Sequence, residues 1–260
     1  MNHLIKQGVA LATLCAAYGF AGVASAAPEV ATETRPIDAR VVRVKLDGVV
    51  DMKIRQGSNA TLVLTGDPRL LGKTTTLQSG DTLNIDTETR GVSLNIGRGS
   101  GLRAELVLPS LREVSSESVG STEVSGFSGE ELELTLDGAG SMNVSSNYRV
   151  ISANLGGVGS MRVHGINSES IDLNLRGAGF VTLSGRSKLL KAELGGLGGL
   201  DAQQCAAETV NLELSGLGNA TVNAQGNANL TLSGMGSVTV YGKPQNRKVE
   251  VEGLGKVSWK

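Results

Sequence analysis

Aromatic residues, proline and cysteine are scarce in this sequence. Of its 260 residues, 3% are aromatic, 5 are proline and 2 are cysteine. Two cysteines are too few for a disulfide-rich scaffold, and the absence of a Gly-X-Y period excludes a collagen-like chain. The formal net charge of −1 leaves no basic surface of the kind that nucleic-acid binding requires. Beyond the N-terminal segment, no apolar run reaches the roughly 18 residues that a transmembrane helix needs.

The N-terminal segment, residues 1–26, has the three parts of a secretory signal peptide. Lys6 supplies the positive charge, residues 8–22 are mostly apolar, and Ala24-Ser25-Ala26 forms a small-residue cleavage site. We therefore predict an exported protein, in the periplasm or at the cell surface. Lipid attachment at Cys15 is a weaker alternative, because this cysteine lies inside the apolar region.

Cleavage after Ala26 would leave Cys205 as the only cysteine, so we expect no internal disulfide. We interpret Cys205 as a small packed side chain. Residues 27–35 are polar and are predicted to form a linker. Residues 36–260 are predicted to form a single domain.

The 36 glycines are abundant and regularly placed. In the second half of the chain a Gly-x-Gly turn recurs between two stretches of alternating apolar and polar residues, and Leu136–Val144 is the clearest copy. Its first glycine returns with an average spacing of about 19 residues, at positions 138, 157, 177, 196, 216, 234 and 253. A period of this length is typical of a solenoid, in which each repeat forms one turn, or rung.

The alternation around each turn predicts strands with one buried face. After the turns, two apolar columns repeat: Met142, Met161, Val181, Leu200, Ala220, Val238 and Val257, and then Val144, Val163, Leu183, Ala202, Val222, Val240 and Trp259. A single rung cannot bury these side chains, whereas stacked rungs bury them against their neighbours. The pattern predicts an all-β fold, a parallel right-handed β-helix with Gly-x-Gly corners.

The residue between the two glycines is apolar in every full copy, and we expect these residues to form a third packed column at the corner. Leu46–Ile54 has the same layout and is predicted to be the first rung, and Ser118–Val124 is a degraded copy. Between them the repeat blurs, but alternation predicts strands over 61–65, 82–86, 92–96 and 102–108.

Several segments resemble a known family. Leu106–Leu111, Val119-Gly120-Ser121, the serial Gly-x-Gly turns and Leu232–Pro244 are similar to the head GIN domain of putative autotransporter adhesins. The resemblance covers about 36–260 and implies an exported β-solenoid of bacterial envelopes with no established enzyme activity. Two features depart from the family pattern: many turns have Gly-Leu-Gly or Gly-Ala-Gly in place of Gly-Ser-Gly, and an additional rung, Val249–Trp259, follows the last matching segment.

No residue pattern predicts a catalytic, cofactor-binding or metal site. Gly195–Asp201 approaches a calcium-binding repeat, but its aspartate is one position too late and no neighbouring copy repeats it. Glu193 and Glu213 fall on adjacent rungs, but Lys191 lies beside Glu193, and we interpret all three as a solvated strand face. His164 is expected in an exposed loop without an acidic partner.

The sequence also lacks a clear carbohydrate platform or ice-binding face. The aromatic residues that follow the predicted signal peptide do not share a repeat column; they are Phe127, Tyr148, Phe180, Tyr241 and Trp259. Thr182, Thr221 and Thr239 share one, but Asp201 interrupts it.

These features predict a non-catalytic envelope or surface protein that binds another macromolecule, an envelope protein or a glycan, through a polar face of the solenoid. The alternatives are a polysaccharide-cleaving β-helix enzyme and a purely structural periplasmic protein. A cleft with clustered acids and bases would favour the enzyme, and a flat polar face would favour binding.

At the C-terminal rung, Val257 and Trp259 fall in the inward columns. We expect Trp259 to fold over the open core as a plug, with an end-to-end homo-oligomer as the alternative to a monomer.

Overall fold

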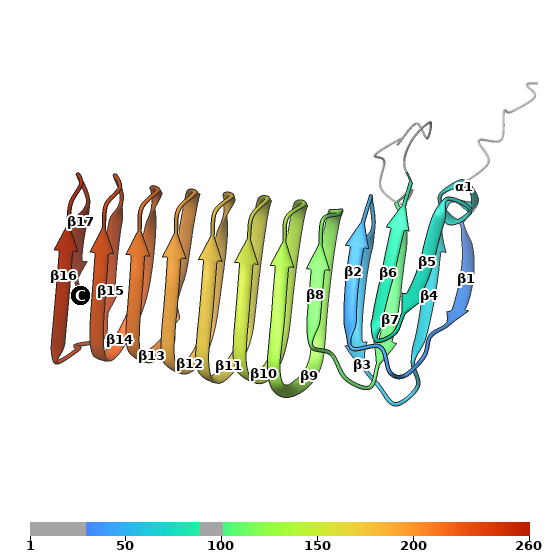
Figure 1. The fold of residues 1–260 in the computed structure, drawn as a ribbon, viewed down its shortest axis with the longest axis horizontal. Helices are drawn as coiled ribbons and strands as arrows, with labels where there is room; N and C mark the ends of the chain where they lie inside the picture. The colour runs from blue at the N-terminus through green and yellow to red at the C-terminus, as the bar shows by residue number, and fades with distance from the viewer. Residues whose placement is uncertain (1–29, 89–100) are drawn as a thin grey trace, which may run out of the picture.

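The computed structural model describes residues 30–88 and 101–260, which form one long stack of β-strands (Figure 1). The predicted signal peptide, Cys15 and the strand expected over 92–96 lie outside the described residues. In the described part, the only helix is the four-residue α1, Pro68–Leu71. No helix in that part is long and apolar enough to cross a membrane.

From residue 113 onward the chain forms the parallel solenoid that the repeat predicts. Equivalent positions of successive rungs pair directly, so that Met142 lies beside Met161 and Met161 beside Val181. The strands of this region are β8 (Glu113–Ser116), β9 (Val119–Leu136), β10 (Ala139–Leu155), β11 (Val158–Leu175), β12 (Ala178–Leu194), β13 (Leu197–Leu214), β14 (Leu217–Leu232), β15 (Ser237–Tyr241), β16 (Asn246–Val251) and β17 (Lys256–Trp259).

The connection between the two long sides of a rung is also paired, which the sequence left open. Ile166–Ser168 pairs with Gly185–Ser187, and Gly185–Ser187 pairs in turn with Cys205–Ala207. Each long strand therefore pairs with the next rung in three places: along each of the two long sides and, after a register shift, over a short segment at the connection between them. The hydroxyl of Tyr148, which is buried here, donates to the carbonyl of Leu111 at 2.6 Å.

The two predicted inward columns are buried from Met142 to Val240, and together with the apolar residues before each turn they form one continuous core. Each fully buried aliphatic side chain contributes about 1.5–3 kcal/mol, so the columns stabilise the stack collectively. Cys205 lies in this core with no exposed surface, as its interpretation as a packed side chain requires.

The N-terminal region differs from the sequence expectation in spatial order. Leu46–Ile54 does form a rung, made of β2 (Arg43–Asp47) and β3 (Asp51–Gln56), but this rung is not at the end of the stack. It lies between the rung of β8 and β9 on one side and the rung of β6 (Thr82–Thr87) and β7 (Arg103–Leu108) on the other (Figure 1). Such order depends on contacts between distant segments, which a local repeat does not encode.

The N-terminal end of the stack differs from the parallel solenoid, because its strands pair antiparallel where the sequence repeat blurs. Strand β1 (Ala31–Pro36) pairs antiparallel with β4 (Thr61–Gly66), β4 with β7, and β5 (Thr74–Ser79) with β6. Most of the linker expected over 27–35 is therefore strand β1. These elements and the buried Leu70 and Leu71 of α1 cover the end of the core, which a parallel rung alone would leave open.

At the C-terminal rung the plug expected of Trp259 is incomplete. Its side chain is partly buried against the core, and the Arg247 guanidinium lies 4.4 Å from the centre of its ring. Val249 and Val251, which occupy inward positions beside Leu230 and Leu232, remain 42% and 44% exposed.

The glycine corners are places of close backbone approach. A Cβ atom on Gly177 would lie 2.0 Å from the carbonyl oxygen of Gly157, and one on Gly216 would lie 2.2 Å from that of Gly196. Neither glycine has a positive φ angle, so space is the reason for glycine at these two positions. Positive φ angles occur at the second glycines of two corners, Gly120 and Gly198.

Replacing Gly177 or Gly216 with valine should therefore lower the free energy of unfolding by about 3 kcal/mol or more, because adjacent corners must separate. The control Thr182→Val changes an outward strand position and should stay within about 0.5 kcal/mol. Equal shifts in melting temperature for the glycine and threonine variants would contradict the corner packing.

Burial raises the pKa of the Cys205 thiol to about 11, from an ordinary value of 9.0. We expect a thiol reagent at pH 8 to react with Cys205 only after unfolding in urea. Because the native state holds this proton more tightly than the unfolded chain, the Cys205 contribution to stability should fall as the pH rises from 9.0 towards 11. Cys205→Ala removes this contribution and provides the control.

Candidate functional site

The acidic residues considered for catalysis form ion pairs on an open strand face. The Lys191 ammonium lies 2.7 Å from the Glu193 carboxylate and 3.8 Å from that of Asp172. The hydrogen bond from Lys191 lowers the pKa of Glu193, whereas a general acid needs a raised value. Glu213 lies beside Glu193 on the next rung, as its repeat position predicts. The geometry matches a solvated face.

The other single candidates are also separate from one another. His164 is exposed as expected, but it lies within β11 and not in a loop, and its Nδ1 lies 2.9 Å from the Ser184 hydroxyl of the next rung. Asp201 accepts a hydrogen bond from the backbone of Gln203 and so stabilises its own strand. Within residues 30–88 and 101–260, no group of three His, Cys, Asp or Glu side chains could hold a metal ion.

The aromatic residues divide between core and surface. Phe127 and Tyr148 are buried, while Phe180 is 49% exposed beside a corner. They form no shared platform, in agreement with their scattered repeat positions.

The apolar residues between the corner glycines point outward, so the expectation of a third packed column was wrong. We call these residues the corner row: Ala139, Val158, Ala178, Leu197, Leu217, Met235 and Leu254. Leu197, Leu217 and Met235 are 57%, 47% and 58% exposed. The stacked glycine backbones fill the inside of the corner, which leaves the side chain between them only the outer side.

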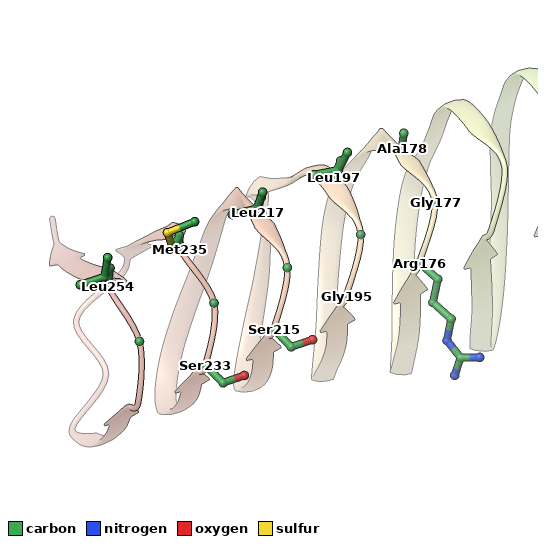
Figure 2. A pocket seen from close by; sticks show the side chains of 14 residues that line it. Arg176, Gly177, Ala178, Gly195, Leu197, Ser215, Leu217, Ser233, Met235 and Leu254 are labelled. Atoms are coloured by element: carbon green, nitrogen blue, oxygen red, sulfur yellow. The ribbon is translucent and has the colours of Figure 1, made fainter.

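Backbone hydrogen bonds align the corner row. The amide of Leu197 donates to the carbonyl of Gly177 at 3.0 Å, and that of Leu217 donates to Gly196 at 3.2 Å. One apolar side chain therefore protrudes from each rung at the strand spacing of about 4.8 Å. Figure 2 shows the corner row from Ala178 to Leu254 following one edge of the solenoid.

Beside the corner row runs a shallow groove of about 560 Å³, which we call the corner groove. Its floor is glycine backbone, one wall is the corner row, and the other carries Ser215 and Ser233 (Figure 2). Arg176 lies at one end. The groove was not anticipated from the sequence, although the apolar residue in each Gly-x-Gly turn is its signal.

A second surface feature is an uncharged stretch of chain whose neighbouring rungs carry charge, since Asn229 lies beside Lys248 and Asn211 beside Lys191. Residues 214–242 contain no Asp, Glu, Lys or Arg. On β13, β14 and β16, side-chain amides and a hydroxyl bridge successive rungs; we call this set the amide ladder, and it comprises Thr209, Asn211, Asn227, Asn229 and Asn246. Asn229 donates to Asn211 at 2.8 Å, Asn227 to Thr209 at 3.0 Å, and Asn246 to Asn227 at 2.8 Å.

The rungs nearer the N-terminus carry an ionic ladder instead. Arg149 lies 2.6 Å from Glu130 and 2.9 Å from Glu169, and Lys188 lies 3.0 Å from the same Glu169. Hydrogen bonds from Lys188 and Arg149 lower the pKa of Glu169. The rungs of β9 to β12 are therefore bridged by ion pairs and those of β13 and β14 by amides, and the last rung is charged again at Arg247, Lys248 and Glu250.

Comparison with known proteins agrees with this architecture. No curated protein matches the sequence. Among solved structures, one described as a putative adhesin from Parabacteroides distasonis is 18% identical, with 89% of this chain and 97% of that chain covered and a TM-score of 0.80. A putative adhesin from Parabacteroides merdae is 18% identical, with 88% and 96% covered and a TM-score of 0.77.

A third structure, described as a putative lipid binding protein from Parabacteroides distasonis, is 19% identical, with 87% of this chain and 96% of that chain covered and a TM-score of 0.73. At these identities the three structures share the fold. The family model described as "Putative auto-transporter adhesin, head GIN domain" matches residues 42–244, nearly the whole solenoid, and the chain belongs to that family.

Proposed function

We propose that this chain is a non-catalytic, adhesin-like surface protein that binds a neutral polysaccharide along the outer face of its C-terminal rungs. The observation that carries the proposal is the amide ladder beside a stretch of 29 uncharged residues, 214–242. Membership of an adhesin family supports a binding role, and the predicted signal peptide over 1–26 supports export.

The chemistry of the amide ladder suits a neutral polysaccharide. An asparagine amide has two donor hydrogens and an acceptor oxygen, and the bonds between rungs use only part of this capacity. The same bonds fix the orientation of the amides, so binding would cost little side-chain entropy. A sugar hydroxyl can donate to and accept from these amides, and it can also accept a hydrogen bond from Lys248, which lies beside Asn229.

The corner groove supports a second candidate function, the binding of a lipid. The corner row exposes apolar side chains on consecutive rungs, which is unusual on a soluble protein surface without a binding role. The description of one structural neighbour as a putative lipid binding protein is in line with this candidate.

To test the polysaccharide proposal, we would measure affinity electrophoresis of the purified chain in a panel of neutral and anionic polysaccharides. Retardation by at least one neutral polysaccharide is expected. Asn229→Val, which removes an amide but suits a strand, should weaken it by about tenfold through the loss of one or two hydrogen bonds.

Asn143→Val is the matched control, because Asn143 is an outward strand residue away from the amide ladder. Its mobility should equal that of the unmodified chain. Failure of every neutral polysaccharide to retard the chain, or equal effects of the two substitutions, would contradict the proposal.

A further inference from the structure

The lipid-binding candidate can be made specific. Resting on it, we infer that the corner groove holds one extended hydrocarbon chain of a single-chain anionic amphiphile, with the anionic head group at Arg176. The inference depends on the length of the groove, the character of its walls and the position of its one basic end.

The groove has the length of one hydrocarbon chain. It passes Ala178, Leu197, Leu217, Met235 and Leu254, one residue from each of five rungs. Four strand spacings of about 4.8 Å give a length of about 19 Å. The hydrocarbon core of a bilayer is about 30 Å thick and contains two opposed chains, so one chain extends for about 15 Å.

The walls suit a hydrocarbon chain and contain no charge along its course. After Arg176 the lining consists of glycine, alanine, serine, leucine and methionine only. An apolar chain lying here would contact Leu197, Leu217 and Met235 on one side, and it would not remove the hydration of any charged lining side chain. These three side chains are about half exposed, and a bound hydrocarbon chain would remove part of their apolar surface from water.

Arg176 provides the site for the head group. Its guanidinium makes no hydrogen bond or ion pair within 4 Å among the residues that the structure describes, although the charge of Glu193 is near enough to interact with it. Arginine binds carboxylates and phosphates through two parallel hydrogen bonds. An anion at the start of the groove would therefore find a donor that is not already engaged.

A polar hollow of about 310 Å³ adjoins the groove at the same residue. It is lined by Arg176 together with Asn154, Asn174, Thr135 and Asp137. The amides of Asn154 and Asn174 can donate to head-group oxygens. The Asp137 carboxylate lies two rungs from Arg176. Because like charges repel, an anionic head group should lie on the Arg176 side of the hollow.

Two other occupants fit less well. The 14 residues lining the groove are fewer than the 20–30 that each partner contributes to a stable protein–protein interface, which argues against a second copy of this chain. The groove carries a single arginine, whereas docking on an anionic bilayer generally uses a cluster of four to eight basic residues.

The test is displacement of cis-parinaric acid fluorescence from the full chain by two competitors of equal chain length, hexadecanoic acid and hexadecanol, below their aggregation limits. The acid should displace the probe at a concentration about tenfold lower than the alcohol. Arg176→Gln should abolish this difference, and Arg162→Gln, at an exposed outward position of the preceding rung, should preserve it.

Leu217→Asp and the milder Leu217→Ser should weaken both competitors, and unchanged circular dichroism would show that these variants remain folded. If neither leucine variant changes binding, the groove is not the site and lipid binding there is refuted. If the leucine variants weaken binding but Arg176→Gln leaves the acid-to-alcohol ratio unchanged, the head-group assignment is overturned while lipid binding stands. Probe release by anionic vesicles but by neither monomeric competitor would overturn the inference in favour of bilayer docking.

Discussion

The contact on which the structure most depends is the approach of one corner glycine to the carbonyl of the glycine one rung earlier. A Cβ atom on Gly159 would lie 1.9 Å from the Gly140 carbonyl oxygen, and the next glycine in the column, Gly179, has almost as little room. Because glycine has no side chain, successive rungs can stay at the normal distance between paired strands, about 4.8 Å, around the corner as well. It also leaves no interior space there, which is why the corner row faces solvent. Folding and the candidate lipid site thus have a common origin.

The local repeat was sufficient to predict most of the solenoid. Its period places Met142, Met161 and Val181 in one column, and the pairing of β10, β11 and β12 confirms this register. It also aligns Gly48 with Ser118, and Val49 indeed bridges to Val119 on the neighbouring rung. Such alignments succeed because a strand alternates sides every residue, so the apolar pattern fixes the register.

What the sequence did not predict depends on contacts between distant segments. Ala31–Pro36 has no apolar alternation, and it becomes a strand only because β4 offers an edge. The outward direction of Leu197 and Leu217 follows from backbone packing and not from their hydrophobicity. Of the candidate surfaces, the uncharged stretch over 214–242 is visible in the sequence. The meeting of Arg176 with the groove and the polar hollow requires the three-dimensional stack.

The position of the β2–β3 rung has a consequence for the order of folding. It is enclosed by β6 and β7 on one side and by β8 and β9 on the other, and these partners follow it in the chain by tens of residues. Closing such long loops is slow, because chain entropy is lost before the contacts form. From β10 onward each rung needs only the rung before it as a template, about 19 residues away. We therefore expect the N-terminal assembly to form more slowly than the later rungs, each of which can add directly to its neighbour in the chain.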